Sequence, residues 1–317
     1  MAEIRRDPLT GRAVILAPER AQRPRQLGTA TVDTDRSQPC PFCPGNEHLT
    51  PPESWSSRPQ DSPPDHAGWS VRVVPNKYPA VTGAAGVHEV IIESTAHVTN
   101  LAALNEEQIT KIFHAYRERL RFWRADQGWR YAMIFKNQGE RAGATFEHAH
   151  AQLVALPFVP ADVANEISRA REYHQRSQQC FGCALIEREL EAQSRVVIGN
   201  QAYIALCPAA PRFAFETWIM PRIHAAAFEQ ANDSMIADLA EITRQVIVAL
   251  DRLQPNPPFN LYIQSPGLNE RERAHYHWQL RILPQFYRAA GFEWGSGMHI
   301  NPVTPEDAAR ALRDALV

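Results

Sequence analysis

Hydrophobic residues recur at helical spacing in two long stretches of the chain. In the first, Asn105-Glu106-Glu107-Gln108 has the form of a helix N-cap with a capping-box partner. The apolar positions after it fall on one helical face: Ile109, Ile112, Phe113, Tyr116, Leu120 and Trp123. The equivalent stripe in the second stretch is Met235, Ile236, Leu239, Ile242, Val246, Ile247 and Leu250. Both stripes predict long helices that pack by one face against a sheet.

Strand-like runs flank each predicted helix. Tyr131-Ala132-Met133-Ile134-Phe135 is one such run, and Leu153-Val154-Ala155-Leu156 follows it. A second closing strand ends at Pro284, and Thr304-Pro305-Glu306-Asp307 predicts a terminal helix because proline suits the first helical position. We therefore predict an α+β fold in which each half is an antiparallel sheet with a crossover helix on one face.

The two halves also repeat their polar residues. A couplet, Cys40-Pro-Phe-Cys43, is followed by His97 and His148, and a second couplet, Cys180-Phe-Gly-Cys183, is followed by His224 and the pair His275 and His277. The closing strands agree in pattern, with His148-Ala-His150-Ala-Gln152-Leu153 against His275-Tyr-His277-Trp-Gln279-Leu280. This repeat indicates a duplicated unit, which we divide into residues 1–157 and 158–317.

The cysteine couplets favour metal binding. Thiolates two residues apart can occupy two corners of a zinc tetrahedron, and only Cys207 remains outside the couplets. A redox role would need a couplet between a strand and a helix, whereas Cys40 and Cys43 stand in proline-rich loop sequence. We expect about two zinc ions per chain.

A row of polar residues follows the glycine-bearing loop of the first half. On an extended segment His148, His150 and Gln152 project from one face. A neutral imidazole can attack phosphorus, and a neighbouring amide can hold phosphoryl oxygens. The alternatives are a metal site or a polar strand that faces water.

Composition sets limits on the class of protein. The chain has 317 residues, 44% of them hydrophobic, and a formal charge of -2, which disfavours a nucleic-acid or anionic-membrane binder. No signal peptide and no membrane-spanning run is recognisable, so we expect a cytoplasmic location without a membrane partner. Part of the 25 prolines lies in residues 51–64, which predicts a surface loop.

Several motifs together resemble the galactose-1-phosphate uridylyltransferase family, a branch of the histidine-triad superfamily, over nearly the whole chain. They are Arg6-Asp7-Pro8-Leu9-Thr10-Gly11-Arg12, Arg20-Ala21-Gln22-Arg23-Pro24, the first cysteine couplet, Phe135-Lys136-Asn137-Gln138-Gly139, Gly143, and His148-x-His150-x-Gln152. The resemblance implies two histidine-triad-like halves and a ping-pong nucleotidyl transfer, in which a nucleoside monophosphate is held covalently while sugar 1-phosphate leaves.

The resemblance also implies roles for individual residues. His150 would be the nucleophile, and Gln152 would bind the phosphoryl oxygens. The other implied substrate contacts are Asn76, Asn137, Thr145, Arg20 and Arg23. The segment with Phe292 and Glu293 resembles the stretch that meets the hexose from a partner subunit, so we expect a homodimer. Without the resemblance, Phe292 would equally suit a core position and Glu293 a helix end.

Two structural zinc sites follow from the same resemblance. The first would comprise Cys40, Cys43, His97 and His148. The second departs from the best-known uridylyltransferases and resembles the two-zinc branch that includes plant ADP-glucose phosphorylase, with Cys180, Cys183, His224 and His277. Internal symmetry with His148 favours His275 as the fourth ligand, whereas the histidine-tryptophan pair favours His277, which we adopt.

Three functions remain open at this stage. The first is transfer from UDP-glucose to galactose 1-phosphate, which we prefer. The second is a nucleotide-sugar phosphorylase or adenylyltransferase, with phosphate as acceptor or adenine as base. The third is a non-enzymatic nucleotide sensor, which would not need His150. The base, the sugar, the acceptor and the oligomeric state are not determined by the sequence.

Overall fold

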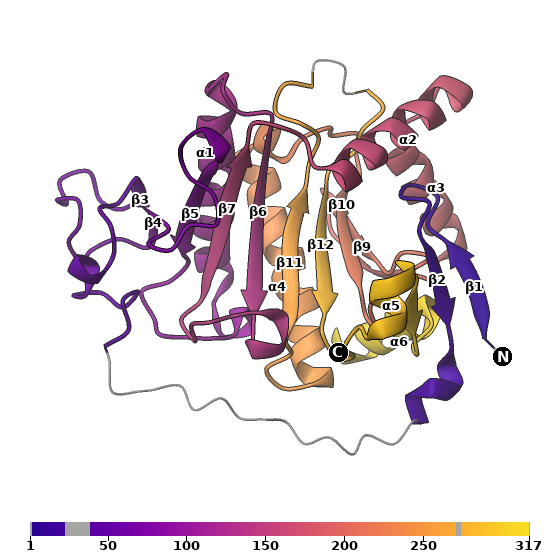
Figure 1. Ribbon diagram of the computed structural model, residues 1–317. Coiled ribbons are helices and arrows are strands. Elements are labelled where there is room, and N and C mark those ends of the chain that lie inside the picture. Colours follow the sequence, from indigo (N-terminus) through magenta and orange to yellow (C-terminus); the bar gives the residue numbers. More distant parts are fainter. Residues whose placement is uncertain (1, 23–38, 271–273, 317) are drawn as a thin grey trace.

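The computed structural model describes residues 2–22, 39–270 and 274–316. Its central feature is a single ten-stranded antiparallel sheet to which both halves contribute five strands (Figure 1). From the outer edge to the centre, the N-terminal half supplies β3 (Trp55–Ser57), β4 (Val71–Pro75), β5 (Val87–Ile92), β7 (His150–Leu156) and β6 (Tyr131–Gln138). The C-terminal half continues from the centre with β11 (Phe259–Gln264), β12 (Gln279–Pro284), β10 (Thr217–Pro221), β9 (Tyr203–Leu206) and β8 (Val196–Gly199).

The strand order is the same in both halves when it is read outward from the centre. β6 pairs with β11, so the two sheets join edge to edge at corresponding strands. The predicted α+β fold with duplicated antiparallel halves is confirmed. The division at residue 157 remains an interpretation, because the two halves share one sheet.

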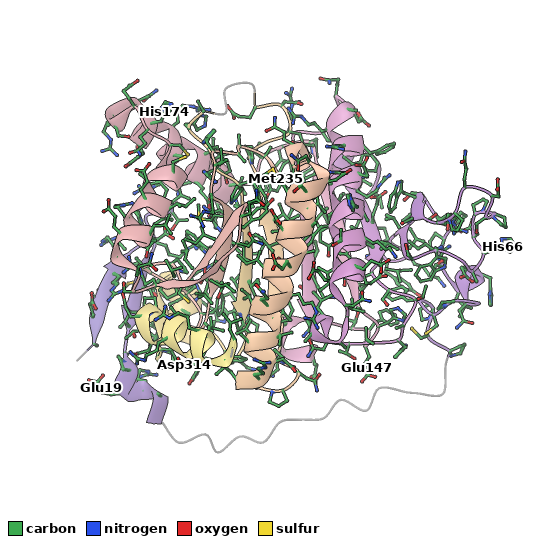
Figure 2. The ribbon with its side chains drawn as sticks, turned by 180° about the vertical axis from the view of Figure 1, so that it is seen from behind. Glu19, His66, Glu147, His174, Met235 and Asp314 are labelled. Carbon is green, nitrogen blue, oxygen red and sulfur yellow. The ribbon has the colours of Figure 1, made fainter. Side chains whose placement is uncertain are left out.

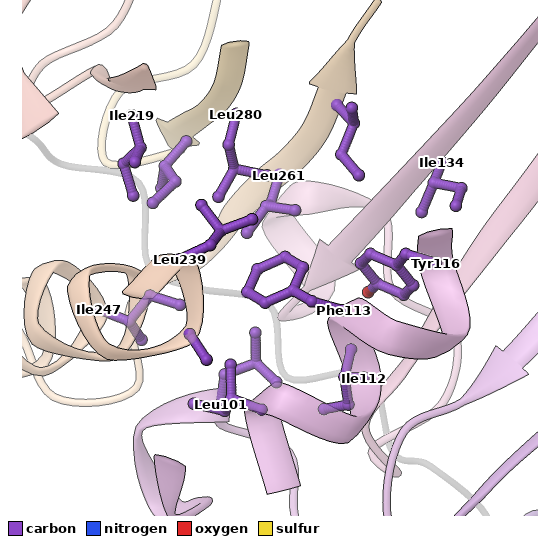
Figure 3. Packing of buried hydrophobic residues seen from close by; sticks show 14 of the residues in the cluster. Leu101, Ile112, Phe113, Tyr116, Ile134, Ile219, Leu239, Ile247, Leu261 and Leu280 are labelled. Carbon is purple, nitrogen blue, oxygen red and sulfur yellow. The ribbon is translucent and has the colours of Figure 1, made fainter. Parts of the chain in front are cut away.

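The two predicted long helices lie together on one face of the sheet. α1 (Glu106–Ala125) and α4 (Asp233–Leu253) pack against each other, and their N-caps are equivalent: the Asn105 side chain accepts from the backbone N–H of Gln108, and Asn232 from that of Met235. Phe113 of α1 and Leu239 of α4 lie next to each other in the core between the helices and the sheet (Figure 3). This apolar layer buries both predicted stripes.

The other face of the sheet is covered by helices mainly over the C-terminal half, and at the border also over Tyr131 of β6, as far as the structure describes it. α2 (Ala161–Ser177) and α3 (Phe181–Ala192) pack there on residues of β9 and β10 (Figure 1). Sequence patterns did not lead us to expect these two helices. A residue such as Ile219 of β10 faces α4, whereas its neighbours Trp218 and Met220 face α2 and α3, because strand side chains alternate.

The chain termini meet on the C-terminal half. β1 (Glu3–Arg6), β2 (Ala13–Leu16) and β13 (His299–Asn301) form a small sheet in which β2 pairs with β13. α5 (Gly291–Ser296) and α6 (Pro305–Leu316) complete the fold, and the predicted start of the terminal helix at Pro305 is confirmed. The predicted loop 51–64 includes the short strand β3. No described helix has the length and apolar character that crossing a membrane requires.

Candidate active site and metal clusters

The first four predicted ligands lie together beside the start of β7. Cys40, Cys43, His97 and His148 place their ligand atoms within 4.8 Å of one another. His148 Nε2 lies 2.8 Å from the backbone oxygen of Ser94, and a carbonyl only accepts, so this nitrogen carries the hydrogen. The other ring nitrogen, Nδ1, therefore faces the sulfur atoms with a lone pair, 3.7 Å from Cys40 Sγ and 3.6 Å from Cys43 Sγ.

The second cluster repeats this arrangement. Cys180, Cys183, His224 and His277 meet at the N-terminus of α3, with Cys180 at its N-cap. His277 Nε2 lies 2.9 Å from the backbone oxygen of Pro221, so its Nδ1 faces Cys183 Sγ at 3.6 Å. The cluster contains His277 and not His275, whose Nε2 is buried without a hydrogen bond among the described residues.

Both donor sets suit a tetrahedral divalent ion. With Zn–S near 2.3 Å and Zn–N near 2.1 Å, neighbouring sulfur and nitrogen ligands are separated by about 3.6 Å. The sulfur-to-nitrogen distances of the first cluster are 3.3, 3.6 and 3.7 Å. Burial, and then a Cys40 thiolate beside it, raise the pKa of Cys43 to about 11, so two thiolates need a cation between them. The clusters therefore fit metal ions, with no position left open for substrate.

The metal clusters fix which residues of the two halves correspond. The backbone N–H of Ala149 donates to Val98 at 2.7 Å, and that of Trp278 donates to Ala225 at 3.1 Å. His148 is thus equivalent to His277, and the position of His150 in the first half is occupied by Gln279 in the second. The alignment of His148 with His275, which the sequence pattern suggested, is shifted by one histidine.

His150 opens β7 and is held in one tautomer. Its Nδ1 lies 2.8 Å from the backbone oxygen of His148, so Nδ1 carries the hydrogen and Nε2 carries the lone pair. Nε2 makes no hydrogen bond with the described residues. Burial, and then the charge of Lys136, lower the pKa of His150, so the imidazole is neutral near pH 7. A neutral ring with a lone pair on its outer nitrogen is the nucleophilic form.

Gln152 follows His150 on the same face and has a fixed orientation. The backbone N–H of Ala80 donates to Nδ1 of His88 at 3.0 Å, so the hydrogen of that ring is on Nε2. His88 Nε2 then donates to Oε1 of Gln152 at 2.8 Å. The NH₂ group of Gln152 remains available as a donor beside His150. Asn76 also lies beside His88, with its Nδ2 3.2 Å from His88 Nε2.

Asn137 lies on the same face of the sheet as Gln152, because it stands two residues after Phe135, the partner of Gln152. Asn137 Oδ1 accepts from Nδ2 of Asn260 at 2.8 Å, and Asn260 also donates to the backbone oxygen of Ala142 at 2.8 Å. A residue of β11 in the C-terminal half therefore orients an N-terminal side chain. Thr145 is exposed in the loop before β7.

Three of the remaining predicted substrate residues, Arg20, Phe292 and Glu293, lie away from His150 of the same chain. Arg20 is exposed in the 3₁₀ helix Pro18–Gln22, and its neighbour Glu19 lies far across the molecule from Glu147, which precedes β7 closely (Figure 2). Arg23 is outside the described residues. Phe292 and Glu293 lie in α5, where Glu293 Oε2 accepts from the backbone N–H of Ala290 at 2.9 Å. Their substrate contacts stay predictions.

Comparison with known proteins identifies the family. The family profile for "Galactose-1-phosphate uridyl transferase, N-terminal domain" matches residues 1–160. ADP-glucose phosphorylase of Arabidopsis thaliana is 32% identical, over 98% of this chain and 92% of that protein. The chain belongs to the galactose-1-phosphate uridylyltransferase family. It is thus an enzyme of that family, related to nucleotidyltransferases and phosphorylases.

Two further relatives agree with this assignment. Galactose-1-phosphate uridylyltransferase of Thermotoga maritima is 28% identical over 100% of this chain and 99% of its own length. The crystal structure of the Arabidopsis thaliana ADP-glucose phosphorylase with bound ADP-glucose superposes with a TM-score of 0.86 and covers 99% of both chains. The likeness to these family members extends over both halves.

Sequence reasoning missed two aromatic rings beside His150. Phe42, inside the first cysteine couplet, is buried with its ring centroid 5.3 Å from that of His150. Phe146 packs on Phe42 at 5.0 Å and on His150 at 6.3 Å. These rings restrict the imidazole and exclude water from one side of it. The only signal in the sequence was the position of Phe42 between two predicted metal ligands.

Proposed function

We propose that the chain transfers a nucleoside monophosphate from a nucleotide sugar through a covalent intermediate on His150. The observation that carries this proposal is the tautomer of His150, whose Nδ1–H is fixed on the His148 carbonyl while Nε2 is free of hydrogen bonds among the described residues. Nε2 forms a bond to the α-phosphorus, the bridging P–O bond breaks, and sugar 1-phosphate leaves with the electron pair. An acceptor phosphate oxygen then displaces the imidazole in line.

The neighbouring side chains support the same step. Gln152, with its carbonyl oxygen held by His88, presents its NH₂ group to the phosphoryl oxygens on which negative charge develops. Asn137 presents its amide from β6 in the same way, because Asn260 occupies its oxygen. Structural zinc in the first cluster would hold His148 and thereby the strand that begins at His150.

For donor and acceptor, we favour a nucleotide-sugar phosphorylase that uses inorganic phosphate. Support comes from the second Cys₂His₂ cluster, which resembles the two-zinc branch, and from the 32% identity to ADP-glucose phosphorylase over the whole length. The alternative, transfer from UDP-glucose to galactose 1-phosphate, was our preference from sequence alone and is supported by the 28% identity to a uridylyltransferase. A cytoplasmic homodimer remains part of the proposal.

The test is covalent labelling with nucleotide sugars that carry ³²P at the α-phosphorus. ADP-glucose and UDP-glucose are compared as donors, and the labelled protein is then treated with phosphate or with galactose 1-phosphate. We expect one acid-labile, base-stable label per chain, removed by phosphate. Discharge by galactose 1-phosphate alone would establish the uridylyltransferase instead.

A matched pair of histidine variants locates the chemistry. His150→Asn removes the nucleophilic nitrogen and should abolish labelling, while zinc content is retained. His66→Asn replaces an exposed histidine that follows the 51–64 loop and should label like the wild type. Labelling that survives in His150→Asn would refute the proposed nucleophile.

A further inference from the structure

Three polar side chains from three elements meet behind the strand that carries His150. Lys136 of β6 donates from Nζ to Oε2 of Glu93 at 2.6 Å and to the backbone oxygen of His150 at 3.1 Å. The hydroxyl of Tyr116 in α1 donates to the other carboxylate oxygen of Glu93. All three are buried, and Figure 3 shows Tyr116 within the apolar layer between α1 and the sheet.

The polar triad of Lys136, Glu93 and Tyr116 is hydrogen-bonded to the backbone at two successive residues, Ala149 and His150. The backbone N–H of Glu93 donates to the carbonyl of Ala149 at 3.1 Å, while Lys136 holds the carbonyl of the next residue, His150. Burial, and then Glu93, raise the pKa of Tyr116 well above its usual value, so the hydroxyl keeps its hydrogen. The triad is therefore a fully hydrogen-bonded chain that ends on the backbone of His150.

The fold itself does not require such a triad. Removing a lysine and a glutamate from water costs several kcal/mol per ion, and apolar residues of similar volume are often as stabilising or more so. A buried ionic chain in an otherwise apolar layer therefore calls for a reason other than packing.

The C-terminal half shows the same fold without the triad. In β6, Lys136 follows Phe135, which pairs with Gln152. In β11, Ile263 follows Tyr262, which pairs with Arg281. Ile263 therefore occupies the position of Lys136. Counted from the paired residues Ile91 and Ile219, Glu93 corresponds to Pro221. Counted from the carbonyls that the equivalent histidines contact, Ser94 and Pro221, it corresponds to Met220. Neither residue carries a charge. Thr243 lies as far along α4 from its N-cap as Tyr116 lies along α1. The half with Gln279 at the nucleophile position thus has no ionic pair there.

We propose that Lys136, Glu93 and Tyr116 are positioning residues that fix the backbone of His150 for in-line attack on phosphorus. The inference rests on the proposed function of His150. Lys136 Nζ and the backbone N–H of Glu93 prevent the start of β7 from shifting along or out of the sheet. A displacement of about 1 Å at a reacting atom can cost about 100-fold in rate, so this rigidity matters for catalysis and not for the stability of the sheet.

An apolar triple variant, Tyr116→Phe with Glu93→Met and Lys136→Met, separates positioning from stability. It keeps the volume of the layer and leaves no buried charge unpaired, so the unfolding midpoint should match or exceed that of the wild type. The labelling rate at saturating nucleotide sugar should fall roughly 10- to 100-fold. The half-saturating concentration should change less than about threefold, because the triad does not touch the substrate.

Two single variants provide reference values for the labelling rate of the triple variant. Tyr116→Phe removes only one hydrogen bond, worth about 1 kcal/mol, and should slow labelling by up to about fivefold. Thr243→Val removes the hydroxyl at the corresponding position of the C-terminal half, which makes no hydrogen bond with the described residues, and should leave the labelling rate unaltered. Slowing by Thr243→Val equal to that by Tyr116→Phe would overturn the inference.

Failure of the inference can be told from failure of the proposed function. A folded triple variant that labels at the wild-type rate overturns the positioning role and leaves His150 as nucleophile. If the wild-type chain takes no label, hydrogen exchange of the amides in residues 149–153 still tests whether the triad fixes the backbone of His150. Exchange there should be faster in the triple variant than in the wild type and unchanged in Thr243→Val, and equal exchange in all three would reject the positioning role.

Discussion

The two halves of the molecule have the same strand order and the same type of metal cluster. They differ in how far the side chains are buried on the sheet face that carries Gln152 and Arg281. In the N-terminal half Gln152 and Val154 of β7 are half-buried on that face. In the C-terminal half the corresponding positions are buried, and Arg281 is fixed by Gln279 Oε1 at 2.8 Å and by Glu166 Oε1 of α2 at 2.8 Å. On this face the N-terminal half leaves the polar side chain of Gln152 partly accessible. In the C-terminal half the polar side chain of Arg281 is buried and hydrogen-bonded within the protein.

This difference separates what the fold requires from what chemistry requires. The metal clusters occur in both halves and so belong to the shared architecture. His150 and its amide neighbour Gln152 occur in one half, whereas the other encloses Arg281 beside a cavity of about 10 Å³, roughly the room of one water. The face of β12 that corresponds to Gln152 is therefore filled by protein side chains, which agrees with our proposal that the nucleotide binds at β7.

The largest effect should follow loss of either metal cluster. Cys43→Ser and Cys183→Ser should each lower the zinc content by one ion and strongly reduce thermal stability, since structural zinc contributes on the order of 10 kcal/mol to the folding of small peptides. Metal analysis and calorimetry measure both. Only Cys43→Ser should also slow labelling of the folded fraction, because His148 precedes His150. Equal slowing in both variants would contradict the division of roles.

The next largest effect concerns Glu166 and Arg281, on the buried face of the C-terminal half. Glu166→Ala leaves the guanidinium of Arg281 buried without its carboxylate and should lower the free energy of unfolding by about 3–5 kcal/mol. Asp162→Ala, on the same helix, removes an exposed carboxylate 3.6 Å from Arg12 and should cost less than about 1 kcal/mol. Urea unfolding measures both. Labelling by folded Glu166→Ala should be normal, and a loss of labelling would place chemistry in the second half.

The open face of the N-terminal half should respond in rate more than in stability. Gln152→Ala removes one donor to the phosphoryl oxygens and should slow labelling about 100-fold. Val154→Ala, the next residue along the same face, should label nearly as fast as the wild type. Rapid-quench labelling compares the two. Similar rates for Gln152→Ala and the wild type would remove Gln152 from the site.

Much of this comparison could be predicted from sequence, because its signals are local or repeated. The apolar stripes and the Asn105 cap predicted α1, and the cysteine couplets with His97 and His148 predicted a cluster. The repeat alone aligned His148 with His275, and only the family's histidine-tryptophan pair favoured His277, because the correspondence depends on backbone hydrogen bonds such as that between Trp278 and Ala225. The triad was missed because each of its residues reads as an isolated polar position in a separate element.

The smallest predicted effect concerns the expected homodimer. If Phe292 and Glu293 complete the site of a partner chain, mixtures of inactive His150→Ala and inactive Glu293→Ala chains should recover about a quarter of wild-type activity, since half the dimers are mixed and each has one intact site. Trp294→Ala, an exposed neighbour in α5, is a useful comparison. A monomer with full activity would reject the shared site.

The central claim is that nucleotidyl transfer takes place on the N-terminal half alone, at His150. Peptide mapping by mass spectrometry of the wild-type chain, quenched at alkaline pH after reaction with a nucleotide sugar, tests it most directly. We predict a single nucleoside monophosphate adduct, located on His150. An adduct on His275 or His277, or one in each half, would contradict the account.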